Sequence, residues 1–184
     1  MKRADWLASQ PSLDIRRLVF LDETWAKTNM TRTHGRCRKG QRLHGKAPYG
    51  HWKTMTFVAG LRLDGIIAPM VLDCPMNGSI FTAYAEQALA RELRPGDILI
   101  MDNLGSHKRQ QARNAIEACG AQILFLPPYS PDMNPIEHLF SKIKTLLRTA
   151  AERTAEDVWR RIGSIIGTIS PQECENYIRN LGYA

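Results

Sequence analysis

Two aspartates each end a short apolar run, at positions where a metal site could form. Asp22 follows the run 18–21 and Asp102 follows the run 98–101. Uninterrupted apolar runs of this length are typical of strands buried on both faces of a sheet. Because the carboxyl ends of parallel strands meet at one edge, the two side chains are expected to converge. Converging carboxylates repel, and a hard divalent cation relieves that repulsion. Either aspartate alone is better explained by a strand-end turn or a helix cap.

Glu137 is the third candidate, and a structural role competes for it. Asn134 and Glu137 have the spacing of a helix-capping box. Along the expected helix, Lys144 and Arg148 continue the face of Glu137, opposite the apolar stripe. A carboxylate followed by two cations could hold a metal and then meet a phosphate backbone, or could form an ordinary solvated face. If Glu137 were only a cap, Asp132 would be the nearest substitute ligand.

Three further polar residues lie beside the two aspartates. Glu23 adjoins Asp22, but alternation along a strand directs it to the other face, so a supporting role is expected. Asn103 and His107 follow Asp102. His107 could orient a phosphate or a water molecule, although it could equally begin a helix.

The basic excess of the chain lies in one segment. The sequence holds 25 Lys and Arg against 18 Asp and Glu, a net charge of +7, and no acidic residue occurs between Glu23 and Asp64. A concentrated run of cations fits a polyanion-facing loop, and a solvated loop is the alternative. The residues expected to contact such a polyanion are Arg36, Arg38, Lys39, Arg42, Lys46, Lys144 and Arg148.

The elements that must position these residues follow from the apolar pattern. Strands are expected at 18–21, 98–101 and 123–126, with a hairpin over 54–72 that turns at Asp64-Gly65. Helices are expected from Ser79 as a cap, over about 107–119, from Asn134-Pro135, from Thr154 and after Pro171. The order predicts an α/β fold with a mixed sheet covered by helices.

Length and composition exclude several classes of protein. The 184 residues suit one domain. No window reaches the roughly 18 apolar residues of a membrane span, and no apolar run follows the N-terminal charges, so we expect a cytoplasmic protein. The four cysteines form no Cys-x-x-Cys pair, which excludes a zinc ribbon.

Three blocks in this order resemble the mariner superfamily of DDE transposases, closest to its bacterial insertion-sequence branch. They are FLDETW at 20–25, MDNLGSH at 101–107 and LPPYSPDMNPIEHLF at 126–140. The resemblance implies an RNase H-like fold in which Asp22, Asp102 and Glu137 bind metal. It also implies cleavage of double-stranded DNA at element ends and joining of the 3′ ends to a TA target. Two Mg²⁺ ions, replaceable by Mn²⁺, suit such displacements at phosphorus.

The resemblance also shapes the expected organisation. Relatives carry N-terminal helix-turn-helix modules, and none fits before the first strand, so we expect that portion to come from an upstream reading frame. We divide the chain into an N-terminal linker or extension, residues 1–16, and a catalytic domain with C-terminal helices, residues 17–184. A homodimer on DNA, associated with the nucleoid, is expected. A non-catalytic DNA-binding remnant, a domesticated transposase and a general RNase H-like nuclease remain alternatives.

Overall fold

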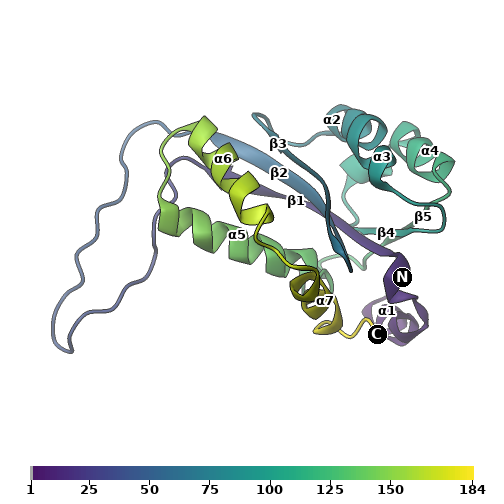
Figure 1. Ribbon diagram of the computed structural model, residues 1–184, viewed down its shortest axis with the longest axis horizontal. Helices are drawn as coiled ribbons and strands as arrows, with labels where there is room; N and C mark the ends of the chain where they lie inside the picture. The colour runs from purple at the N-terminus through teal and green to yellow at the C-terminus, as the bar shows by residue number, and fades with distance from the viewer. Residues whose placement is uncertain (1) are drawn as a thin grey trace.

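The computed structural model describes residues 2–184 and shows a five-stranded mixed sheet between two groups of helices (Figure 1). The strand order is β3-β2-β1-β4-β5, and β1, β4 and β5 run parallel, while β2 and β3 are antiparallel to their neighbours. This arrangement confirms the expected α/β class. The strands are β1 (Leu18–Lys27), β2 (Thr54–Arg62), β3 (Gly65–Leu72), β4 (Ile98–Met101) and β5 (Gln122–Phe125).

Each face of the sheet is covered by its own helices, which explains why the strand sequences are continuously apolar. Leu18 and Phe20 of β1 belong to one core cluster, whereas Val19 and Leu21 belong to the other. The first cluster is completed by α1 (Arg3–Ser9), α5 (Ile136–Ala150), α6 (Ala155–Ile166) and α7 (Pro171–Arg179). The second cluster is completed by α2 (Gly78–Tyr84), the π-helical turn Ala85–Leu89, and α4 (Gln110–Ala118), with the short α3 (Ala90–Glu92) between them.

Strand β1 is longer than predicted, which changes the setting of Asp22. The parallel ladder with β4 ends at the pair Leu21–Met101, but antiparallel pairing with β2 continues to Lys27. Asp22 therefore lies inside a strand, opposite Ala59 of β2, and one residue beyond the end of the parallel ladder. The apolar run 18–21 predicted only the part of β1 that is covered by helices on both faces, and not the whole strand.

Two helix starts differ from the prediction. Asn77, not Ser79, caps α2, because the Asn77 side chain accepts hydrogen bonds from the N–H groups of Ser79 and Ile80 at 3.0 Å each. The helix expected from His107 begins at Gln110, and His107 belongs to a preceding 3-10 turn, Gly105–Lys108. The hairpin is confirmed, and β5 begins and ends one residue before the expected 123–126.

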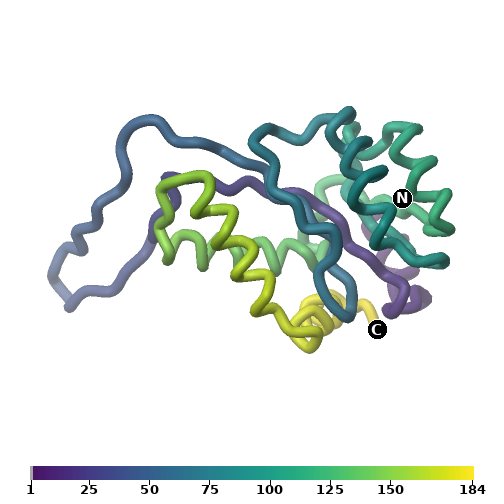
Figure 2. The backbone as a smooth tube through the Cα atoms, turned by 45° about the horizontal axis from the view of Figure 1, so that its top comes forward, coloured from purple at the N-terminus to yellow at the C-terminus, as the bar shows by residue number. Residues whose placement is uncertain are grey.

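The basic segment forms a long arm between β1 and β2 (Figure 2). Its root is closed where Thr28 N–H donates to the Lys53 carbonyl at 3.1 Å, and Arg153 donates to the Met30 carbonyl at 2.9 Å. Beyond that root the segment contains no helix or strand, and its cations are exposed.

The N-terminal segment packs against the domain. Trp6 of α1 is buried in the core, and its indole N–H donates to the hydroxyl of Tyr183 at 3.0 Å. That hydroxyl donates in turn to the Met133 carbonyl at 2.9 Å, which ties both ends of the chain to the segment before α5.

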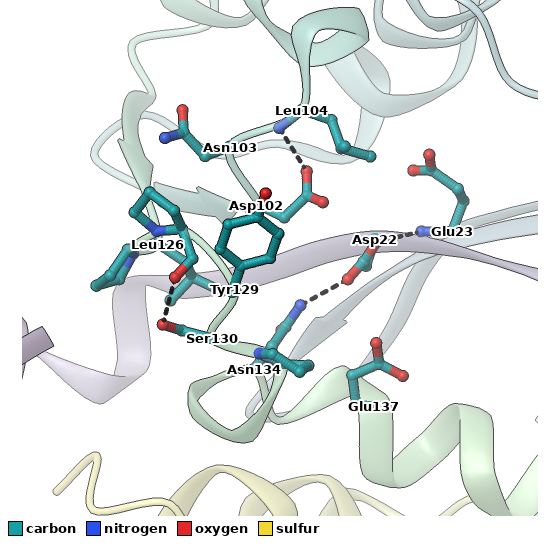
Figure 3. A pocket seen from close by; sticks show the side chains of 13 residues that line it. Asp22, Glu23, Asp102, Asn103, Leu104, Leu126, Tyr129, Ser130, Asn134 and Glu137 are labelled. Atoms are coloured by element: carbon teal, nitrogen blue, oxygen red, sulfur yellow. Dashed lines mark hydrogen bonds between the residues drawn. The ribbon is translucent and has the colours of Figure 1, made fainter.

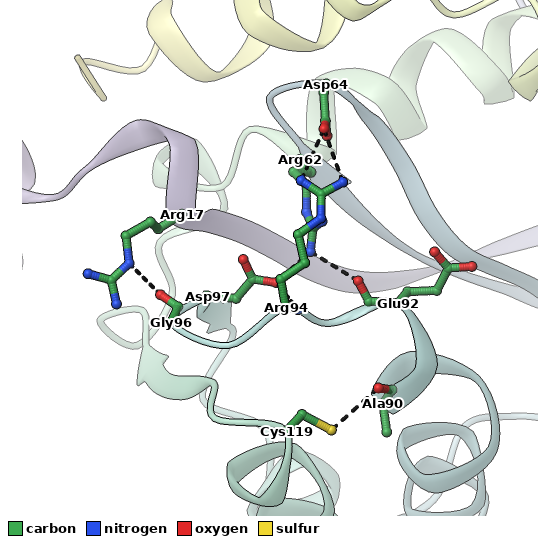
Figure 4. Close-up of polar contacts among 9 residues, drawn as sticks. All are labelled: Arg17, Arg62, Asp64, Ala90, Glu92, Arg94, Gly96, Asp97 and Cys119. Atoms are coloured by element: carbon green, nitrogen blue, oxygen red, sulfur yellow. Dashed lines mark hydrogen bonds and ion pairs between the residues drawn. The ribbon is translucent and has the colours of Figure 1, made fainter.

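A buried ion pair holds the end of the sheet at which β4 begins (Figure 4). The guanidinium of Arg62 meets the carboxylate of Asp97, and their side chains are only 2% and 6% exposed. Arg62 also donates to the Glu92 carbonyl at 3.2 Å, and the Arg94 N–H donates to Asp97 at 2.7 Å. These contacts anchor the start of β4, whose other end carries Asp102.

Candidate active site

Three carboxylates from different elements line one cavity of about 490 Å³ (Figure 3). Asp22 comes from β1, Asp102 follows β4, and Glu137 lies in the first turn of α5. The parallel pairing of β1 with β4 brings the first two together, and α5 crosses beneath β1 to add the third. The cavity therefore collects the three residues that the sequence analysis selected.

Asp22 is held by two hydrogen bonds in a crowded acidic environment. Its Oδ1 accepts from the Glu23 N–H, and its Oδ2 accepts from the Asn134 side-chain amide, both at 2.8 Å. Burial raises the pKa of the Asp22 carboxyl to about 7, and the negative charges of neighbouring carboxylates add to the rise. A cation that enters the cavity would stabilise the ionised form of this carboxyl.

The capping box proposed for Asn134 and Glu137 is wrong. No side-chain hydrogen bond caps α5, and the Asn134 side-chain amide donates to Asp22. The side chain of Asn134 is 1% exposed, and its Oδ1 is buried without a hydrogen-bond partner. The capping-box spacing did not predict this contact, because Asp22, the partner of Asn134, lies far away in the sequence on β1. The carboxylate of Glu137 is consequently left facing the cavity.

His107 links two acidic residues behind the cavity. Its Nε2 lies 3.0 Å from Glu23 Oε2, and its Nδ1 lies 2.8 Å from Asp102 Oδ1, although off the direction needed for a hydrogen bond. Burial lowers the pKa of His107, but contacts with the two carboxylates outweigh burial and raise the pKa to about 10. The ring packs on Phe81 at 4.5 Å between centroids. His107 thus pairs with Glu23 and places its ring against Asp102.

Glu23 and Asn103 also reach the cavity wall. Strand alternation places Glu23 on the face of α2 and α4, as expected, and its partner His107 lies on that side. Asp132 does not line the cavity: it is exposed and bound to Arg3 at 2.6 Å, which holds the pKa of the Asp132 carboxyl below its usual range. Asp132 is therefore not placed to replace Glu137 at this cavity.

The cavity lining fits a hard divalent cation. Carboxylate oxygens are the ligands that Mg²⁺ and Mn²⁺ prefer, and the lining contains neither Lys nor Arg that could neutralise them or a phosphate. Within residues 2–184, no three Asp, Glu, His or Cys side chains stand close enough to form a complete metal cage. Asp22, Asp102 and Glu137 thus line an open cavity rather than a preassembled metal site.

Cationic side chains continue from the cavity toward the arm. The Lys144 ammonium lies 4.7 Å from the centroid of the Trp25 ring, and Lys27 lies 4.8 Å from the same ring. Burial lowers the pKa of Lys144, although the charge of Glu137 counteracts this. Arg148 and Lys46 line a second cavity of about 500 Å³ between α5 and the arm. The remaining predicted contacts, Arg36, Arg38, Lys39 and Arg42, are exposed on the arm.

Comparison with known proteins identifies the family. The family model described as DDE superfamily endonuclease matches residues 17–158, which is most of the chain. The chain belongs to this family. The three acidic positions of this DDE endonuclease lie within the matched range, in the elements described above. No curated protein matches the sequence.

Solved structures give the same fold. The Mos1 transposase paired-end complex with left transposon end is 21% identical, with a TM-score of 0.78 over 97% of this chain and 56% of that one. The Mos1 strand transfer complex gives 0.74 at 21% identity, covering 97% and 55%. The Mos1 catalytic domain with raltegravir and Mg gives 0.73 at 19% identity, covering 97% and 87%. These matches confirm the expected RNase H-like fold, and this chain spans about half the length of the first two.

None of the helices between residues 2 and 184 is long and apolar enough to cross a bilayer.

Proposed function

We propose that this DDE endonuclease is the catalytic domain of a DNA transposase that cuts DNA strands and joins their 3′ ends to a target. The observation that carries the proposal is the meeting of Asp22, Asp102 and Glu137 around one cavity. The three come from β1, the end of β4 and α5, which are far apart in the sequence. Similarity to structures of Mos1 in paired-end and strand-transfer complexes supports the choice of reaction.

Different residues of the chain would bind the metal and position its ligands for an in-line displacement at phosphorus. We assign metal binding to Asp22, Asp102 and Glu137, with Asp22 between the other two. Two bound Mg²⁺ or Mn²⁺ ions would supply charge stabilisation for the attacking and leaving oxygens. Asn134 fixes the orientation of Asp22 through a hydrogen bond, and His107 sets a positive charge beside Asp102. Oriented ligands keep their geometry as charge develops, which lowers the cost of reorganisation.

The cations outside the cavity supply the DNA-binding surface in this proposal. The exposed arm carries Arg36, Arg38, Lys39, Arg42 and Lys46, and α5 adds Lys144 and Arg148 on the face that leads from Glu137. Phosphate contacts from such residues give affinity without sequence information. The cations are thus placed to hold a duplex whose scissile phosphate enters an acidic cavity.

The proposal extends to partners and setting. The substrates are double-stranded element ends and a TA target, bound by a homodimer. A helix-turn-helix portion encoded by an upstream reading frame would recognise the ends. The element belongs to the bacterial insertion-sequence branch, and the protein works at the nucleoid. The paired-end arrangement of Mos1 supports the dimer.

The test is incubation of the purified chain with end-labelled duplex DNA and Mg²⁺ or Mn²⁺, beside an Asp102→Asn control. We expect metal-dependent nicks from the unmodified chain, joined products when target DNA is present, and neither from the control. Hydrolysis without joining would identify a general nuclease. Binding without cleavage at any metal concentration would identify a non-catalytic remnant.

A further inference from the structure

Tyr129 combines a left-handed backbone conformation with an exposed aromatic side chain, and the fold requires neither from a tyrosine. Its φ of +56° lies in the left-handed region, which residues with a side chain rarely adopt, and its side chain is 99% exposed. Glycine takes this conformation without strain, so the turn itself does not call for tyrosine. Because the ring is not buried, the core does not call for it either. Strain retained at an exposed aromatic residue points to a function of the ring.

The loop around Tyr129 is built to hold that conformation. Prolines precede and follow the Tyr129-Ser130 pair, and each proline fixes its own φ. Ser130 is 4% exposed; its hydroxyl donates to the Pro128 carbonyl at 3.2 Å and accepts from Arg3 at 3.0 Å. Arg3 also forms two hydrogen bonds with Asp132, at 2.9 and 2.6 Å. The ring is therefore presented from a braced loop rather than from a freely moving one.

The ring lies at the cavity that holds the three carboxylates (Figure 3). The lining has two chemical parts. One part is acidic and suits metal and phosphate. The other part is apolar: Leu104, which is 48% exposed, and Tyr129 join the residues Leu126, Pro127, Pro128 and Pro131. An apolar surface with an exposed aromatic ring, next to a phosphate site, suits the flat face of a nucleobase.

We propose that Tyr129 is a stacking platform for the base of a nucleotide adjoining the scissile phosphate, which leaves the duplex stack when DNA binds. This inference rests on the proposed function and adds the form in which the DNA is held. Every base has a π-face, so the contact tolerates any sequence. Removal of one base from the stack has a moderate cost, which stacking on the ring offsets.

The experiment pairs a change in the protein with a change in the DNA. The position cut by the unmodified chain is first mapped on a labelled duplex in Mn²⁺. Each of the two nucleotides that flank this position is then replaced, in turn, by an abasic residue. Cleavage efficiency, kcat/KM, is measured on each duplex for the unmodified chain, Tyr129→Gly and Tyr129→Phe. Tyr129→Gly removes the ring and relieves the strained φ, so its thermal midpoint is expected to be equal to or above that of the unmodified chain.

We expect Tyr129→Gly to reduce kcat/KM on intact DNA by roughly tenfold or more. The abasic residue at one flanking position should reduce cleavage by the unmodified chain, yet cause no further loss in Tyr129→Gly. Tyr129→Phe keeps the ring and should behave as the unmodified chain does on every duplex.

Three results would overturn the inference. Tyr129→Gly could cleave intact DNA as well as the unmodified chain does. The losses from the variant and from both abasic duplexes could add independently, which would show that the ring and the base do not interact. Absence of cleavage by the unmodified chain on every DNA would instead overturn the proposed function, and this inference with it.

Discussion

At the scale of single residues, Glu137 is distinguished by a carboxylate that does not cap its helix and that faces the cavity. We expect Glu137→Gln to keep the thermal midpoint within about 2 °C, because a substitution that keeps the shape of the side chain changes the free energy of unfolding by at most about one tenth of its usual value. We expect cleavage to fall by at least about a hundredfold, because a neutral amide is a poor ligand for a hard cation. Circular dichroism and labelled-DNA cleavage measure the two effects. Activity within a few-fold of the unmodified chain would exclude Glu137 as a ligand.

Asn134 acts in the proposed site as a positioning residue, through its hydrogen bond to Asp22. Asn134→Ala removes the amide that donates to Asp22 Oδ2. We expect a roughly 10–100-fold loss of activity, together with a rise in the Mg²⁺ concentration that gives half-maximal rate. A metal titration of cleavage provides the measurement, and Asn103→Ala is a comparison on the same cavity wall. An unchanged metal dependence would show that the Asn134–Asp22 contact is only structural.

At the scale of elements, the arm between β1 and β2 is the main candidate for non-specific DNA binding. Six phosphate contacts would give a slope of log K against log salt of about −5. Replacing Arg36, Arg38, Lys39 and Arg42 with Ala should flatten the slope to about −2 and leave the thermal midpoint unchanged, because these side chains are exposed. Fluorescence anisotropy over a salt series measures the slope. An unchanged slope would show that the arm is merely solvated.

Contact between α5 and α7 makes stability depend on pH. Burial raises the pKa of Glu173, but hydrogen bonds from Lys142, at 2.6 and 2.8 Å, and from Tyr177 outweigh burial and lower it. A carboxyl with a lowered folded-state pKa stabilises the protein above its unfolded pKa, about 4.3, and this contribution disappears as the pH falls through the folded value.

The matching variant is Lys142→Met, which removes the cation and keeps the aliphatic stem. We expect a loss of about 1 kcal/mol at pH 7 and a smaller loss at a pH below the lowered folded-state pKa of Glu173, where that carboxyl is protonated in the folded and the unfolded protein. Urea unfolding at the two pH values measures the difference. An equal loss at both pH values would mean that packing, not the ion pair, links these helices.

At the scale of the whole molecule, the end of the sheet remote from the cavity holds the strand order in place. Asp97→Ala leaves the Arg62 guanidinium buried without its partner, so we expect a loss of about 3–5 kcal/mol. Replacing both residues, as Arg62→Met with Asp97→Leu, should recover much of that loss because no charge remains buried. Urea unfolding of both variants tests this. If the double variant is no more stable than Asp97→Ala, the pair contributes through packing instead.

Much of the architecture followed from the sequence, because its signals are local. Continuous apolar runs marked β1, β4 and β5, and the turn at Asp64-Gly65 marked the hairpin, since covering both faces of a sheet and reversing a chain each constrain neighbouring residues. The acidic triad followed from strand ends and from three family blocks. Boundaries were less accurate, because the length of β1 depends on pairing with β2, which lies beyond the arm.

The tertiary structure alone decided the roles of residues whose partners are distant in sequence. Asn134 had the spacing of a cap, yet its side-chain amide donates to Asp22, 112 positions away, and a hydrogen bond to a carboxylate is stronger than one between neutral groups. His107 contacts Glu23 of β1, and the strained backbone and exposed ring of Tyr129 become visible only in three dimensions. Spacing rules describe interactions within a turn or two. The chemistry of this cavity depends on contacts that form only when β1, β4 and α5 have packed together.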